Sequence, residues 1–145
     1  MVNSLEKEFR MRNRRKGTAL VETEKGILMV REKGNRDYSL PGGGADRGES
    51  RKEAAMRELR EETGMMPLSA EYLCHYRGNP FTGYRGDRIQ NDVKVFIVKA
   101  SGTPKALDEI EEVRWWKPGS SLRLCRGQWR TLKAYEEYKA GKAEK

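Results

Sequence analysis

The sequence contains few of the residues on which metal clusters, disulfide scaffolds and histidine-based active sites depend. It has two cysteines, Cys74 and Cys125, and one histidine, His75. Two cysteines at this spacing make neither a metal-ligand pair nor a disulfide framework, so we expect both to be reduced and in or near the core. One histidine leaves none to spare for a Ser-His-Asp triad, and a strand histidine without companions is more often structural or at the surface than catalytic.

Long apolar runs are also missing. No run approaches the roughly 20 residues of a membrane span, and the N-terminal stretch MVNSLEKEFRMRNRRKG lacks the apolar region of a secretory signal. We therefore expect a soluble, cytoplasmic protein without a membrane partner.

Positive charge is in excess. The 145 residues include 30 Lys and Arg against 22 Asp and Glu, which gives a formal net charge of +8. A basic excess implies an anionic partner such as nucleotide, polyphosphate or RNA. Charge alone does not separate these partners, and we expect a small-molecule nucleotide, with nucleic acid as the alternative.

The chain length is that of one domain with one core, and no internal repeat or linker divides it. We predict a single domain over residues 1–145, with a basic arm at residues 1–15 and a disordered tail at residues 140–145. The oligomeric state can be a monomer or a homodimer, because no sequence motif indicates an oligomer interface.

Apolar patterning predicts an α/β fold. Strands are expected at residues 18–21, 27–30, 38–40, 68–76, 89–100 and in the second half of 107–116, and helices at about 51–63 and 128–139. The first two strands suggest a hairpin, and the run 89–100 carries the strongest strand signal, so we place it near the centre of the sheet. This order suits an α/β/α sandwich around a mixed sheet.

The clearest local signals lie in residues 40–65, LPGGGADRGESRKEAAMRELREETGM. Glycines in the turn permit positive φ and a close backbone approach to a ligand or metal. Ser50 is the expected N-cap, with Glu53 at the capping-box spacing, and Gly64 is the expected residue that ends the helix.

Three glutamates of this helix, Glu58, Glu61 and Glu62, share one face, and the opposite side is expected to carry Met56, Leu59 and the stem of Lys52. Like charges at this spacing destabilise a helix by about 0.2 to 0.5 kcal/mol per pair unless a positive group lies beside them. Arg57 is four residues from both Glu53 and Glu61 and can bridge to either. We expect a divalent metal to balance the remaining charge, since clustered carboxylates suit Mg²⁺ or Mn²⁺.

These residues fill the pattern G-x5-E-x7-R-E-U-x-E-E-x-G-U, in which U is apolar. The fixed positions are Gly43, Glu49, Arg57, Glu58, Leu59, Glu61, Glu62, Gly64 and Met65. The chain therefore resembles the Nudix hydrolases. The resemblance implies the Nudix α/β/α sandwich and the hydrolysis of a nucleoside diphosphate linked to a group X, by water attacking a phosphorus.

The resemblance also implies roles for individual residues. Metal ligands would be Glu58, Glu61 and Glu62, together with the carbonyl of Gly42, and the metal would be Mg²⁺ or Mn²⁺. Glu49 would either support the metal ligands without binding the metal itself or act as the base, and Arg57 would orient the carboxylates. A further acid is expected in the segment before the last strand, where Glu109 is preferred and Glu111 or Glu112 are the alternatives.

Segments outside the signature offer candidate substrate contacts. In the predicted loop 77–88, Phe81 or Tyr84 can stack on a nucleobase, and Arg85 or Arg88 can reach phosphate; Arg14 of the arm can do the same. The alternative is an ordinary mobile loop and a solvated terminus.

The substrate stays open among nucleoside triphosphates, ADP-ribose, dinucleoside polyphosphates and the 5′ pyrophosphate of RNA. Nudix subgroups differ by a proline or a tyrosine at a set distance beyond the signature, so the resemblance implies ADP-ribose-like substrates from Pro80 and dinucleoside polyphosphates from Tyr84. The other functional class considered is a catalytically silent sensor that binds nucleotide or RNA.

Overall fold

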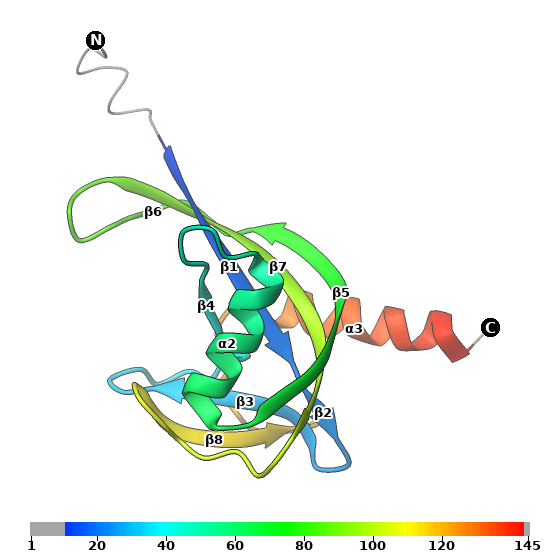
Figure 1. The fold of residues 1–145 in the computed structure, drawn as a ribbon. Coiled ribbons are helices and arrows are strands. Elements are labelled where there is room, and N and C mark those ends of the chain that lie inside the picture. Colours follow the sequence, from blue (N-terminus) through cyan, green and yellow to red (C-terminus); the bar gives the residue numbers. More distant parts are fainter. Residues whose placement is uncertain (1–10, 144–145) are drawn as a thin grey trace.

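The computed structural model describes residues 11–143, and residues 1–10 of the predicted basic arm lie outside this range (Figure 1). The elements are β1 (Met11–Leu20), β2 (Glu22–Thr23), β3 (Gly26–Glu32), β4 (Gly42–Gly44), α2 (Arg51–Thr63), β5 (Met66–Arg77), β6 (Phe81–Thr82), β7 (Arg88–Ser101), β8 (Ile110–Trp116) and α3 (Gln128–Ala143).

The strands form two sheets. The larger has the order β4-β1-β7-β5, with β6 also paired to β7, and the smaller has the order β2-β3-β8. β1 and β7 run parallel, whereas β4, β5 and β6 pair antiparallel with their neighbours, so the larger sheet is mixed. The predicted hairpin of residues 18–21 with 27–30 is wrong in its first strand, because residues 18–20 lie in β1 of the larger sheet and the strand that pairs with β3 is β2. β7 lies between β1 and β5 as expected.

The two helices cover opposite sides of the larger sheet (Figure 1). Successive residues of β1 show why, because side chains alternate across a strand. Ala19 packs with Ala55 and Leu59 of α2, whereas Leu20 packs in a second core that contains Leu132 and Tyr135 of α3. The predicted α/β fold, with helices around a mixed sheet, is confirmed.

The predicted arm and loop are more regular than expected. Residues 11–15 are the first half of β1 rather than an arm, because β7 continues to Arg88 and pairs with β1 as far as Met11. The predicted loop 77–88 is interrupted by β6, where Phe81 and Thr82 pair with Ile89 and Arg88. The backbone of both segments is therefore held by the ladder of β7.

Two other boundaries differ from the prediction. Residues 140–143 of the predicted tail continue α3, and residues 144–145 lie outside the described range. Residues 38–40 make only isolated bridges, from Ser39 to Val30 and from Tyr38 to Leu124. Neither helix of the described residues is long and apolar enough to cross a membrane.

Candidate active site

Helix α2 begins and ends where its local signals predict. The Ser50 hydroxyl accepts a hydrogen bond from the Glu53 N–H at 3.0 Å, and the Ser50 N–H donates to Glu53 Oε1 at 3.1 Å, which completes the capping box. Gly64 ends the helix with a φ of 75°, a value that favours glycine. Because Glu53 is used in the cap, it is not the partner of Arg57 that its spacing also allowed.

The start of α2 is pressed against β1. A Cβ added at Gly17 of β1 would lie 1.9 Å from the carbonyl oxygen of Arg51, so only glycine permits this approach. On the same side of the sheet, the buried carboxylate of Asp92 on β7 contacts Arg51 Nη1 and His75 Nε2. Burial alone would raise the pKa of Asp92, but the hydrogen bond with His75 and the charge of Arg51 bring it below its ordinary value.

This anchoring group was not predicted. His75 was expected to be structural or at the surface, and its contact with Asp92 agrees with a structural position. Asp92 lies in the strand expected at residues 89–100, and we assign it no role from the sequence alone. An acidic residue within a largely apolar strand does indicate that Asp92 has a special role. The neighbouring sequence does not identify the residues that Asp92 contacts.

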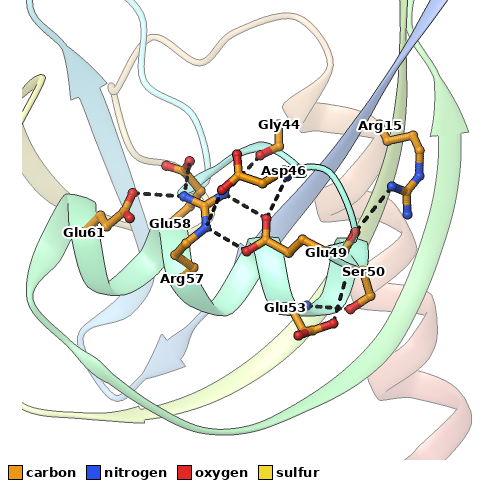
Figure 2. Close-up of polar contacts among 9 residues, drawn as sticks. All are labelled: Arg15, Gly44, Asp46, Glu49, Ser50, Glu53, Arg57, Glu58 and Glu61. Atoms are coloured by element: carbon orange, nitrogen blue, oxygen red, sulfur yellow. Dashed lines mark hydrogen bonds and ion pairs between the residues drawn. The ribbon is translucent and has the colours of Figure 1, made fainter.

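The guanidinium of Arg57 holds the glycine loop and the helix together (Figure 2). Its Nε and Nη2 donate to the two carboxylate oxygens of Glu49 at 2.7 and 3.0 Å. Nη2 also donates to the Gly44 carbonyl at 3.1 Å, and Nη1 donates to Glu58 and Glu61 at 3.0 Å each. These hydrogen bonds raise the pKa of Arg57, and they lower the pKa of Glu49 to about 2.

Glu62 lies on the buried side of α2, which corrects the predicted division of the helix. The face of α2 that carries Glu62 also carries the buried residues Ala54, Ala55 and Leu59, while Lys52 is exposed. The residue is 4% exposed. Burial and the neighbouring carboxylate of Glu58 raise the pKa of Glu62 to about 9.

The glycine loop is shaped to fit these carboxylates. The Gly42 N–H donates to Glu62 Oε1 at 3.3 Å. A Cβ added at Gly43 would lie 2.6 Å from Glu58 Cδ, so a side chain there would displace the carboxylate. The three glycines form β4, and their antiparallel pairing with residues 16–18 of β1 fixes the distance between loop and helix.

The donor set fits a divalent cation. Glu58 and Glu62 lie together; among the described residues no ion pair forms with Glu62, and the cation whose charge acts on both glutamates is Lys16. Buried charges are normally paired or bound to metal, and carboxylate oxygens suit Mg²⁺ and Mn²⁺. No three acidic, cysteine or histidine side chains within residues 11–143 already surround one point, since Arg57 engages Glu58 and Glu61.

Two cations of β1 that no motif records also lie near the site. Lys16 pairs in register with Gly44, and burial, followed by the charge of Arg14, lowers its pKa. Arg15 lies on the other face of the strand, where its Nη1 donates to the Glu49 carbonyl at 3.3 Å (Figure 2). Basic side chains that point to alternate faces of a strand produce this arrangement. The predicted arm at residues 1–15 therefore does not anticipate it.

The downstream acids differ in their surroundings. Glu109 is exposed, and its carboxylate has no hydrogen-bond or ion-pair partner among the described residues. The loop that carries it is tied to the end of α2, because the Leu107 N–H donates to the Glu62 carbonyl at 3.0 Å. Glu112 is held by Arg31 and Arg114, and Glu111 is exposed.

The predicted substrate contacts lie together, with one exception. Arg14, Phe81, Tyr84 and Arg85 line a cavity of about 580 Å³ between β1 and the β6–β7 hairpin. Arg88 is not among the lining residues and donates to the Thr82 hydroxyl at 3.2 Å.

The fold and the glutamate-bearing helix define an α/β protein of the Nudix type. The chain matches the NUDIX domain over residues 11–135 and belongs to this family. A protein named ADP-ribose pyrophosphatase from Methanocaldococcus jannaschii is 31% identical over 126 residues, which cover 84% of this chain and 72% of that protein.

Two further relatives extend the comparison. A protein named RNA pyrophosphohydrolase from Shewanella piezotolerans is 39% identical over 113 residues, which cover 63% of this chain and 64% of that protein. A crystal structure described as a nudix hydrolase family member from Chromobacterium violaceum superposes with a TM-score of 0.71 at 34% identity, covering 86% of this chain and 77% of that one. The expected class, a pyrophosphohydrolase acting on nucleoside diphosphates linked to a group X, is confirmed.

Proposed function

We propose that this chain hydrolyses the phosphoric anhydride of a nucleotide substrate with Mg²⁺ or Mn²⁺ held by Glu58, Glu61, Glu62 and the carbonyl of Gly42. The single observation that carries the assignment is the buried, unpaired carboxylate of Glu62 beside Glu58. Without a cation, the raised pKa keeps Glu62 protonated at neutral pH, and a bound cation would offset the charge of the ionised pair. A bound cation would neutralise phosphate oxygens and lower the pKa of an attacking water.

The surroundings of Glu49 favour one of the two roles considered for it. Both of its carboxylate oxygens accept hydrogen bonds from Arg57, and its pKa is lowered to about 2. A general base works best when its pKa is near the working pH, and a carboxylate with this pKa holds a proton poorly. We therefore assign Glu49 and Arg57 to positioning, in which they fix Gly44, Glu58 and Glu61.

Glu109 is our candidate for the base. Its carboxylate is free of partners among the described residues, and its loop is hydrogen-bonded to the last turn of α2. Glu112 is less suitable, because the hydrogen bond from Arg114 lowers its pKa. Glu109→Gln should lower kcat more than Glu111→Gln does, measured at saturating substrate; equal kcat values for the two variants would remove Glu109 from this role.

The substrate class is a nucleotide with a pyrophosphate linkage. One relative is named for ADP-ribose and another for RNA, so both substrates belong in the first assay. The two cysteines are unpaired, which supports a reducing compartment such as the cytoplasm. Fractionation of cells that express the full chain checks this location.

The test is to separate and quantify the products formed from nucleoside triphosphates, oxidised nucleoside triphosphates, ADP-ribose, diadenosine polyphosphates and triphosphorylated RNA, with Mg²⁺, Mn²⁺ or EDTA. Glu61→Gln is expected to lower turnover by about a hundredfold or more. The matched control is Glu53→Gln, which makes the same change on the same helix in a residue used for capping. Turnover in EDTA, or near-normal turnover by a folded Glu61→Gln variant, would contradict the proposal.

A further inference from the structure

A cationic surface continues from the active site along one face of β1. We call it the basic ledge, formed by Arg12, Arg14 and Lys16 of β1 with Phe81, Tyr84 and Arg85 of the β6–β7 hairpin. In Figure 1, the N-terminal half of β1 and the hairpin extend together past the first turn of α2. Arg12, Arg14 and the three hairpin residues line the 580 Å³ cavity described above.

The strand spaces the three cations of β1 evenly. Residues two apart on a strand point to the same face and lie about 6.8 Å apart. The intervening residue Arg15 faces the helix side, where it donates to the Glu49 carbonyl. Arg12, Arg14 and Lys16 therefore form a row of positive charges on the face away from α2.

This row of cations extends to the glycine loop. A Cβ added at Gly44 would lie 3.4 Å from Arg14 Nε, so the guanidinium of Arg14 lies directly against the loop. The carbonyl of the same glycine accepts from Arg57. Arg14 thus lines the cavity and also contacts the glycine loop, on the face of β4 opposite to Glu58. A ligand that extends from the glycine loop along β1 passes over it.

The ledge carries aromatic rings among charges that are largely unpaired. Tyr84 is 94% exposed and Phe81 is 39% exposed. The guanidinium of Arg85 lies 5.6 Å from the centre of the Tyr84 ring. Among the described residues, Arg12 pairs with Asp87 at 3.2 Å, whereas Arg14 and Arg85 have no acidic partner. Unpaired cations interleaved with exposed rings suit a ligand that has both phosphates and bases.

We propose that the basic ledge binds the nucleotides that follow the first one in a single-stranded nucleic acid, so that the preferred substrate carries a 5′ di- or triphosphate on an oligonucleotide. This inference rests on the hydrolase proposed above. Water adds to one phosphorus of the 5′ anhydride, and the bond from that phosphorus to the bridging oxygen breaks. The leaving phosphate or pyrophosphate takes the bridging oxygen, and the proton of water passes to the base or to solvent.

The chain-length dependence of hydrolysis tests the proposal. We would measure kcat/KM for a nucleoside triphosphate and for 5′-triphosphorylated RNA of two, four and eight nucleotides, with DNA of four nucleotides as a parallel series. The ledge predicts that kcat/KM rises at least about tenfold between the mononucleotide and the tetramer, chiefly through KM, because stacking strengthens binding by about 5- to 150-fold per base. Equal values at all lengths, or faster hydrolysis of a diadenosine polyphosphate, would overturn it.

Variants at the ledge give a second readout. Tyr84→Ala should reduce the preference for tetramer over mononucleotide by about fivefold or more, and Tyr84→Phe should restore it, because stacking needs the ring and not the hydroxyl. Arg12→Ala should lower the slope of log KM against log salt by about one for the tetramer. The control Lys99→Ala removes an exposed cation near the far end of β7 and should leave both quantities unchanged.

The outcomes separate the two proposals. Absence of metal-dependent turnover on every substrate would contradict the hydrolase assignment itself. A second outcome is turnover that Glu61→Gln abolishes but that does not depend on oligonucleotide length, or whose length preference Tyr84→Ala does not change. This outcome would support the hydrolase assignment and exclude the basic ledge as a nucleic-acid subsite.

Discussion

The glutamate cluster of α2 and the basic ledge adjoin each other, but the protein assembles them in opposite ways. In the cluster, one arginine binds three glutamates, and these partly buried charges leave an excess of negative charge. On the ledge, charges of one sign lie exposed, and most have no acidic partner among the described residues. The cluster is a pre-organised network in which each group depends on its neighbours, whereas the ledge is a surface whose partner comes from outside.

This contrast predicts different consequences of mutation. Groups that share partially buried hydrogen bonds lose stability and geometry together when one is removed. Exposed cations and rings affect affinity and salt dependence and leave the fold unchanged. Variants in the cluster should therefore change kcat or the free energy of unfolding.

The largest expected effect is on turnover by Glu58→Gln. Loss of one carboxylate charge beside Glu62 should lower kcat by about a hundredfold or more while the fold is retained. Single-turnover hydrolysis, together with circular dichroism, measures both properties. Glu137→Gln, the same change on exposed α3, should keep normal turnover; a Glu58→Gln variant with normal kcat would show that the cluster is not catalytic.

Arg57→Ala should cost about 2 to 4 kcal/mol of unfolding free energy, because three glutamates and the Gly44 carbonyl lose their shared donor. Urea denaturation in EDTA at neutral pH measures this loss. Arg60→Ala removes an exposed arginine from the same helix and should cost less than about 0.5 kcal/mol. If the two variants were equally stable, the hydrogen bonds of Arg57 would not be the basis of the cluster.

Gly43→Ala should lower kcat by about tenfold with little loss of stability. The added Cβ meets the carboxylate end of Glu58, which can move aside without disturbing the backbone. Gly44→Ala is the matched control, since its Cβ would lie 3.4 Å from the flexible side chain of Arg14. Steady-state kinetics and thermal melts of the pair distinguish displacement of a catalytic carboxylate from general damage to the loop.

The smallest effect concerns acid stability. The pKa of Glu49 is lowered from its ordinary value of 4.5 to about 2, so its ion pair with Arg57 stabilises the fold above pH 4.5, and this contribution is lost as the pH falls toward 2. Wild type should exceed Glu49→Gln by about 1 to 2 kcal/mol at pH 7. Urea titrations between pH 7 and pH 3 should show the difference shrinking below pH 4.5; a constant difference would mean that Gln disrupts packing instead.

The parts of the structure that were predicted correctly depend on short-range contacts. The limits of α2 follow from Ser50, Glu53 and Gly64, whose hydrogen bonds span three or four residues. The strand 89–100 was recognised by its apolar run. The division of α2 into an apolar and an acidic side was wrong because Glu62 turns inward to meet Gly42, a contact that periodicity does not report.

The sequence by itself determined the helix, its caps, the glycine loop and the family to which the chain belongs, because those signals lie within one continuous stretch. Tertiary structure alone decided that residues 11–15 are strand, that Asp92 anchors Arg51, and that Arg12 and Arg14 lie beside Phe81 and Tyr84. The physical reason is that the parallel pairing of β1 with β7 joins distant segments. Such pairing depends on which strands the core brings together, and no local spacing specifies it.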